Sequence, residues 1–167
     1  CASNQLISLD VSNNPALTTL NFHNNQITSI DVSQNSALTT FFCSSNQLTS
    51  LDLSNNTALT NLNCASNQLI SLDVSNNPAL TFLSCSSNQL TNLDVSNNTA
   101  LTTLYCPVNQ LTALDVSNNT ALTTFWCYNN PNLTCINVDD VNYSTNNWTN
   151  IDAQHYFSTN CPPPLPP

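Results

Sequence analysis

The chain has 167 residues, of which 40% are hydrophobic, so it is long and apolar enough to bury one core or one array of repeats. It contains no Lys and no Arg against nine Asp plus Glu residues, which gives a net charge of −9 at pH 7. Because nucleic acids and anionic membrane surfaces are bound through basic side chains, this composition excludes both as partners, and no stretch is apolar enough to insert into a membrane.

Cysteines recur at a fixed interval of 21 residues from Cys43 to Cys127, and Cys1 lies in the same phase. A period of this length predicts a solenoid, in which each repeat buries its apolar face against its neighbours. The unit at Leu17–Ala37 reads LTTLNFHNNQITSIDVSQNSA and contains one phrase of the form LxxLxLxxN followed by a second, similar phrase. We therefore expect two short parallel strands in every coil, with the solenoid extending over residues 1–131.

Alternation along each strand predicts which side chains point inward. In the first half of the coil Leu20 and Phe22 point inward while Asn21 points outward, and in the second half Ile30 and Val32 point inward. Since coils stack at about 4.8 Å, each position becomes a column along the solenoid.

Asparagine takes the place of glycine, which is absent from the chain. Because Asn is the next residue that tolerates left-handed backbone, we expect paired asparagines to form the turns. These pairs are Asn13–Asn14, Asn55–Asn56, Asn76–Asn77, Asn97–Asn98 and Asn118–Asn119. In a further column we expect the side-chain amides to bond the turn backbone of adjacent coils. That column comprises Asn25, Asn46, Asn67, Asn88 and Asn109.

Five or six of the cysteines in phase are expected to occupy an inward column, where a thiol packs as a small hydrophobic group. Stacked parallel strands hold their Cβ vectors parallel at roughly 4.8 Å, which suits a disulfide poorly, so we expect free thiols. Burial raises the pKa of a thiol and a straight row offers no tetrahedral site, which argues against nucleophilic and metal-binding roles.

The phrases LTTLNFHNNQI and LTNLNCASNQL resemble leucine-rich repeats, and the 21-residue form with Cys and LDVSNNxAL is similar to repeats of secreted Bacteroidetes proteins. Residues 132–161 are similar to a closing module that follows such repeats. The resemblance implies a mainly β leucine-rich-repeat solenoid, an extracellular or cell-surface location, and a binding or adhesion module. Its ligand would be a protein or a carbohydrate recognised through the first-strand face.

Cys135 and Cys161 break the 21-residue phase, and we predict that they form a disulfide that pins residues 132–161 over the last coil as a cap. A cap is needed because the final coil would otherwise expose apolar side chains and an unpaired strand edge. The expected apolar cover is Trp148, Ile151, Tyr156 and Phe157. The Pro-rich residues 162–167 are expected to be an extended linker.

Aromatic residues differ from coil to coil on the outward side of the first strand, which also carries His23. Outward aromatics without a folding role are typical of recognition surfaces, although they can also cover the sheet or pack against the cap. The candidate ligand-binding residues are Phe42, Phe82, Tyr105, Trp126 and Tyr128.

A ladder of aspartates that begins at Asp10 follows the second strand, with serines beside it. Stacked carboxylates repel one another, so the ladder is either a solvated face with loose counterions or a weak calcium site. The sequence indicates no other cofactor. The candidate ligands are Asp31, Asp52, Asp73, Asp94 and Asp115.

An enzyme is the poorer interpretation. The two histidines, His23 and His155, are expected to lie far apart, and the regular Asp ladder has no differentiated pair for acid–base work. The alternative to a binding module is a structural or assembly unit, a rigid spacer or fibre subunit that associates end to end through an open N-terminal edge of the solenoid.

Overall fold

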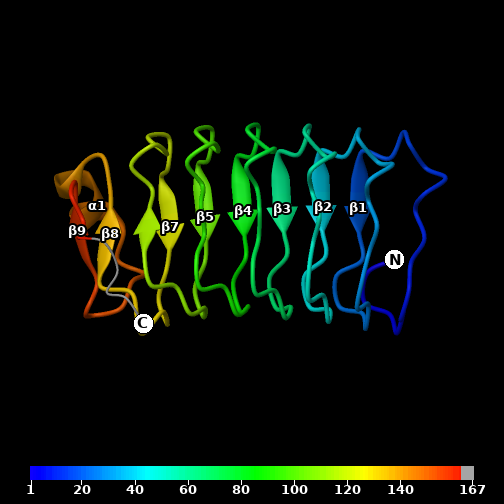
Figure 1. Ribbon diagram of the computed structural model, residues 1–167, viewed down its shortest axis with the longest axis horizontal. Coiled ribbons are helices and arrows are strands. Elements are labelled where there is room, and N and C mark those ends of the chain that lie inside the picture. Colours follow the sequence, from blue (N-terminus) through cyan, green and yellow to red (C-terminus); the bar gives the residue numbers. More distant parts are fainter. Residues whose placement is uncertain (163–167) are drawn as a thin grey trace.

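The computed structural model describes residues 1–162 and shows a rod of stacked coils, with the N-terminus at one end and a small cap at the other (Figure 1). The first strands of six coils form one parallel sheet in the order β1-β2-β3-β4-β5-β7. A smaller parallel sheet, β6-β8-β9, leads into the cap. No helix among residues 1–162 is long and apolar enough to cross a membrane.

The strands of the large sheet are three residues long. They are β1 (Thr19–Asn21), β2 (Thr40–Phe42), β3 (Asn61–Asn63), β4 (Phe82–Ser84), β5 (Thr103–Tyr105) and β7 (Thr124–Trp126). The remaining elements are β6 (Leu114–Asp115), β8 (Cys135–Asn137), α1 (Val141–Asn147) and β9 (Tyr156–Ser158).

The strand register stacks equivalent repeat positions, as the 21-residue period predicts. Leu20 lies opposite Phe41, which in turn lies opposite Leu62. The inward positions form one continuous core in which Phe22 is completely buried and Ile30, near the N-terminal end, is partly buried. Burial of one such side chain contributes about 2 kcal/mol, so the columns are the main source of stability in a chain without Lys or Arg.

The second half of the coil forms less regular strand than predicted. Within the described part of the chain, only β6 pairs there as a strand, with β8. In the other coils one or two backbone bonds link this half to the next coil, as from the N–H of Gln47 to the carbonyl of Ile27 at 2.9 Å. The aspartate of each phrase accepts the N–H of the serine two residues later, for example Ser54 to Asp52 at 2.9 Å, so the side chain replaces a strand-to-strand bond.

The left-handed turn position is not at the predicted asparagine pairs. It directly precedes the Asn column that begins at Asn25, where the chain turns sharply at the end of the first strand. The residues with positive φ are Ser3, Asn24, Ser45, Ser66, Ser87, Val108 and Asn129. The predicted pairs instead close turns through backbone bonds such as that from the N–H of Asn14 to the carbonyl of Val11, at 3.0 Å.

The column of Asn25, Asn46, Asn67, Asn88 and Asn109 makes the predicted bonds between coils, and Asn130 continues it. The side-chain oxygen of Asn67 accepts the N–H of Leu48 at 3.0 Å. Its amide nitrogen donates to the carbonyls of Cys43 and Cys64 at 3.1 and 3.0 Å. Each asparagine therefore ties its own coil to the preceding one.

A second buried asparagine column lies behind the second strand. The amide nitrogen of Asn77 donates to the carbonyls of Leu53 and Asn56 at 3.2 and 2.9 Å, whereas its oxygen has no partner. The same holds for the side-chain oxygens of Asn35, Asn56, Asn98 and Asn119. In this second column the side-chain amides therefore donate hydrogen bonds to backbone carbonyls but accept none.

The cysteine column is buried and free, as predicted. Its members are Cys43, Cys64, Cys85, Cys106 and Cys127. Burial raises the pKa of the Cys64 thiol to about 12, so this thiol is not a nucleophile at neutral pH.

The cap closes the C-terminal end, and the predicted Cys135–Cys161 disulfide is present. Trp148 is buried, with its ring centroid 4.9 Å from that of Phe125 in the last coil and 5.8 Å from that of Phe157. Ile151 also packs against the core. Tyr156 is 50% exposed, so its predicted role as apolar cover is wrong: the adjacent residues His155 and Phe157 are buried or packed against the core instead.

In the last coil, the carboxylate of Asp152 accepts the backbone hydrogen bonds that a following coil would otherwise accept. In inner coils the backbone N–H groups at the left-handed turn donate to carbonyls of the next coil, as Asn24 does to Ser44 at 2.9 Å. In the last coil the Asn129 and Asn130 N–H groups donate to the carboxylate of Asp152 at 2.8 and 2.9 Å. Of the predicted linker, residues 163–167 lie outside the described residues.

Candidate functional site

The outward columns of the large sheet form the first-strand face. One column passes through Phe42, Asn63, Ser84, Tyr105 and Trp126, which are paired from strand to strand. In coils near the N-terminus this face carries mainly Thr, Asn and Ser, whereas in the coils nearest the cap it becomes aromatic.

Three of the predicted aromatic residues form a continuous stack across successive coils, which we call the aromatic ridge: Phe82, Tyr105 and Trp126. The ring centroids of Phe82 and Tyr105 are 5.7 Å apart with perpendicular planes. Those of Tyr105 and Trp126 are 4.5 Å apart with planes inclined by 31°. Such pairs are worth roughly 0.5–1.5 kcal/mol beyond burial, so the ridge holds its shape in the absence of a ligand.

The other candidates are placed differently. Tyr128 lies beside the ridge, two residues beyond Trp126, and the two side chains are 36% and 38% exposed. Phe42 is separated from Tyr105 in its column by Asn63 and Ser84, so the structure does not bring it to the ridge. His23 lies near the N-terminal end, where its Nδ1 is 2.8 Å from the side-chain oxygen of Asn21.

Val108 is a residue of this surface that the sequence prediction missed. It occupies the left-handed turn position with φ of 57° and is 41% exposed. Positive φ is unfavourable for a side chain with a branched Cβ, and the inner coils place Ser there. The signal was available as the replacement of a recurring Ser-Ser or Ala-Ser pair by Pro107-Val108 in the coil that also carries Tyr105.

The second-strand face carries the aspartate ladder, in which every carboxylate accepts hydrogen bonds from a serine. The Ser54 side chain and N–H lower the pKa of Asp52, and the Ser12 N–H lowers that of Asp10. These bonds favour the ionised form of each carboxylate. Among the described residues no group of three or more His, Cys, Asp or Glu side chains is arranged to hold a metal ion. Calcium binding by Asp31, Asp52, Asp73, Asp94 and Asp115 stays a prediction.

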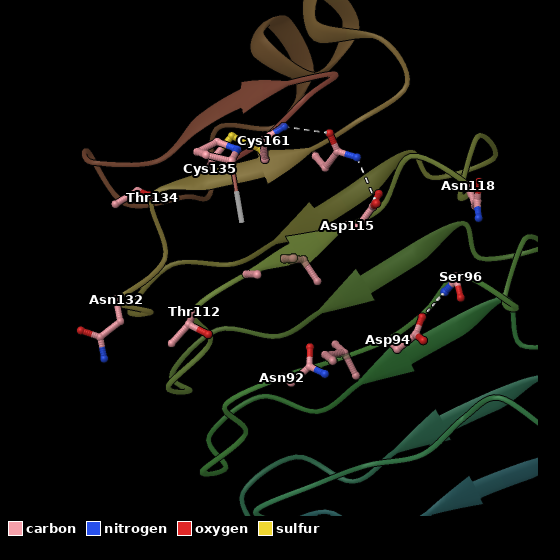
Figure 2. Close-up of a pocket in the computed structure, with 15 residues that line it drawn as sticks. Asn92, Asp94, Ser96, Thr112, Asp115, Asn118, Asn132, Thr134, Cys135 and Cys161 are labelled. Carbon is pink, nitrogen blue, oxygen red and sulfur yellow. Dashed lines mark hydrogen bonds between the residues drawn. A yellow bond between two sulfur atoms is a disulfide. The ribbon is translucent and has the colours of Figure 1, made fainter. Parts of the chain in front are cut away.

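A groove of about 930 Å³ opens at the cap end of this second face (Figure 2). We call it the cap groove. Two neighbouring coils contribute Asn92 with Asp94 and Thr112 with Asp115, and the cap contributes the Cys135–Cys161 disulfide on the opposite wall. The further lining residues are Leu93, Ser96, Ala113, Leu114, Asn118, Asn132, Thr134, Asn137 and Pro162.

The second histidine, His155, is part of the cap structure. Its Nδ1 accepts the N–H of Asp152 at 3.2 Å, while its Nε2 lies 3.3 Å from the Asp152 carboxylate and 3.3 Å from the carbonyl of Asn130. Both ring nitrogens are therefore occupied in fixing the cap on the last coil.

The architecture is similar to that of leucine-rich-repeat proteins of known structure. The functional domain of InlJ from Listeria monocytogenes, which includes a cysteine ladder, superposes with a TM-score of 0.74 at 39% sequence identity, covering 79% of this chain and 32% of that one. The fold is a leucine-rich-repeat solenoid. Its column of buried thiols is likewise a ladder of cysteines.

Two further structures support the same fold. Internalin C2 from Listeria monocytogenes superposes with a TM-score of 0.74 at 22% identity, covering 90% of this chain and 66% of that one. A leucine-rich-repeat protein from Leptospira interrogans gives a TM-score of 0.71 at 22% identity, covering 81% and 41%. This chain spans about a third of the InlJ chain. It matches no protein-family model and no curated protein.

Proposed function

We propose that this chain is an extracellular or cell-surface binding module that recognises a protein partner through the cap end of its first-strand face. The contact surface consists of the aromatic ridge together with Tyr128 and Val108. The observation that carries the proposal is a cluster of apolar side chains at positions where most other coils carry small or polar residues. In this cluster Val108, Trp126 and Tyr128 are exposed, and the Phe82 and Tyr105 rings are half-buried.

Strain at Val108 supports a role for this surface in binding. Local backbone strain persists where the surrounding structure enforces it, and it is common at binding sites. A serine at this position, as in Ser66 or Ser87, would cost the fold less, so folding alone does not account for the valine. An apolar side chain that extends the ridge does account for it.

The geometry of the ridge favours a protein over a carbohydrate. Sugars stack on open aromatic faces, but Tyr105 and Trp126 are inclined by only 31° at 4.5 Å, so each ring covers one face of the other. What remains accessible is an apolar, ridged surface, which suits the side chains of a protein loop. Because the chain carries a net charge of −9, the complementary partner surface is neutral or basic.

The location and the repeat type complete the proposal. A disulfide such as Cys135–Cys161 persists in oxidising compartments, which supports an extracellular or cell-surface site. We also propose that the 21-residue repeat is of the type found in secreted Bacteroidetes proteins.

An array that presents both extracellular proteins and glycans would test the proposal with three forms of the chain: wild type, Trp126→Ser and the control Phe42→Ser. Phe42 lies in the same column but away from the ridge, so its change removes an aromatic residue without altering the proposed surface. We expect Trp126→Ser to weaken binding to proteins about tenfold or more, and Phe42→Ser to leave it unchanged.

Thermal unfolding of all three forms serves as the control for folding. Equal binding by wild type and Trp126→Ser, or absence of any protein bound by wild type, would refute the proposed contact surface. Binding of glycans alone with the same sensitivity to Trp126→Ser would refute the protein partner.

A further inference from the structure

The cap gives one end of the aspartate ladder a distinct chemical environment. The carboxylate of Asp115 accepts the N–H and hydroxyl of Ser117 at 2.9 and 2.6 Å through one oxygen. Its other oxygen accepts the side-chain amide of Asn137, from strand β8, at 3.0 Å. Asn137 in turn accepts the N–H of Cys161 at 3.4 Å, so the disulfide-bonded cap fixes the orientation of this carboxylate (Figure 2).

Asp94 lies one coil away in the same groove and is less constrained. One of its oxygens accepts the N–H of Ser96 at 2.9 Å, and the ladder places its carboxylate next to that of Asp115. The bonds from the Ser96 side chain and N–H lower the pKa of Asp94, and they outweigh burial and the repulsion from Asp115 and Asp73, which act to raise it. Burial likewise opposes ionisation of Asp115, and the bonds from Ser117 and Asn137 hold its pKa below the ordinary value.

Two ionised carboxylates therefore share a groove with no counter-charge from the chain itself. The sequence contains no Lys and no Arg. The N-terminal ammonium donates to the carbonyl of Asn21 at the other end of the rod, and His155 contacts Asp152 within the cap. Any positive charge that binds at Asp94 and Asp115 therefore comes from outside the chain, either as a solvent cation or as part of a bound molecule.

The dimensions and lining of the groove identify the kind of cation. A volume of about 930 Å³ is typical of a pocket for an organic ligand and much exceeds that of one metal ion. Among residues 1–162, no third His, Cys, Asp or Glu side chain joins the two carboxylates to make a compact metal site. Amide and hydroxyl groups of Asn92, Asn132 and Thr134 line the groove beyond the carboxylates and are suited to a peptide backbone.

We propose that the cap groove is a second binding site, which takes a peptide segment bearing Lys or Arg, with the basic side chain between Asp94 and Asp115 and the peptide backbone against the amide and hydroxyl wall. The site lies on the second-strand face and does not depend on the aromatic ridge. It uses charge complementarity, whereas the ridge uses apolar contact.

Calorimetric titration with the blocked pentapeptide Ala-Arg-Ala-Lys-Ala, at roughly 0.15 M salt so that long-range attraction is screened, would test this proposal. The variant is the double change Asp94→Asn with Asp115→Asn. Its matched control is Asp31→Asn with Asp52→Asn, which removes the same charge from a second, smaller hollow of the same ladder, far from the cap. Asparagine preserves the turn-forming hydrogen bonds in both.

We expect the wild type to bind the peptide, the cap-groove variant to weaken binding about tenfold or more, and the control to change it less than about twofold. The peptide with citrulline and acetyl-lysine in place of its basic residues should bind as weakly as the variant does. Thr112→Trp, which fills the groove with the charge unchanged, should also abolish binding and covers the case in which the double variant fails to fold. No binding by wild type, or equal loss in both double variants, would overturn the proposal.

Discussion

The two asparagine columns differ in what they satisfy, and this predicts different costs of removing them. Asn67 and Asn77 lie in the same coil and are both buried, so Asn67→Ala and Asn77→Ala delete the same atoms from similar surroundings. The change at Asn67 leaves the buried N–H of Leu48 without an acceptor, because that N–H bonds only to the Asn67 side chain.

The magnitudes follow from the bonds that each change removes. An orphaned buried N–H costs about 2 kcal/mol, and the lost amide donors of Asn67 add about 1 kcal/mol, so Asn67→Ala should cost about 3 kcal/mol. At Asn77 both carbonyl acceptors keep a backbone partner, since Asn56 N–H donates to Leu53 and Leu59 N–H donates to Asn56, at 3.0 and 3.1 Å. Removal of its unpartnered oxygen offsets part of the loss, which leaves about 1 kcal/mol.

Urea unfolding followed by circular dichroism measures this difference. With a slope of about 2 kcal/mol per molar urea, the midpoint should fall by about 1.5 M for Asn67→Ala and by about 0.5 M for Asn77→Ala, at unchanged slope. Equal losses, or a larger loss at Asn77, would refute the assignment of the first column as the main link between coils.

Further predictions concern strain, pH, thiols and association. Val108→Asn should stabilise the chain by about 1 kcal/mol, seen as a rise of roughly 2–4 °C in the melting temperature, because Asn24 and Asn129 occupy the same left-handed position; no rise would contradict the strain. The hydrogen bonds to Asp152 outweigh its burial and lower its pKa in the folded state. The stabilisation from this carboxylate is therefore present above the ordinary carboxyl pKa and is lost as pH falls through the folded value. Asp152→Asn should make the free energy of unfolding depend less on pH in this acidic range, and an unchanged dependence would count against the contact. A thiol reagent should modify Cys1 alone in the folded chain and six cysteines after denaturation, and fewer than six would show a second disulfide. Sedimentation against concentration separates the proposed binding module from the alternative assembly unit: the sedimentation coefficient should not rise with concentration for the binding module, and a rise would favour end-to-end association.

The sequence was most informative where one residue has one physical role in every coil. The period of Leu20, Phe22 and the cysteines predicts the buried columns, because alternation in a short strand leaves each side chain only two directions. The loss of phase at Cys135 and Cys161 predicts the disulfide for the same reason: these two positions cannot join the inward row.

Features that depend on the relative position of residues far apart in the chain could not be predicted from the sequence. The left-handed turn falls on Ser45 and Ser66, whose residue type does not indicate positive φ, so the prediction went to asparagine pairs such as Asn55–Asn56 in the other half of the coil. Asp152 is one acid among several until its position against the N–H groups of the last coil is known. The cap groove brings Asn92 and Pro162 to one cavity, which no local pattern encodes.

The surface residues show the same division. The outward direction of Tyr105 and Trp126 follows from alternation along the strand. The contact of Tyr105 with Phe82, which belongs to the neighbouring outward column, could be seen only in the three-dimensional arrangement of the coils. Alternation equally places Phe42 on this face, and only the distance along the rod separates it from the ridge.

Hydroxyl-radical footprinting of the chain with a protein recovered from the array tests the proposed contact surface most directly. Trp126 and Tyr128 are exposed in the free chain and should be oxidised there, then protected when the partner is bound. Tyr143 and Tyr156, exposed on the cap, should be oxidised equally with and without the partner. Protection of the cap tyrosines with Trp126 still oxidised would contradict binding through the first-strand face.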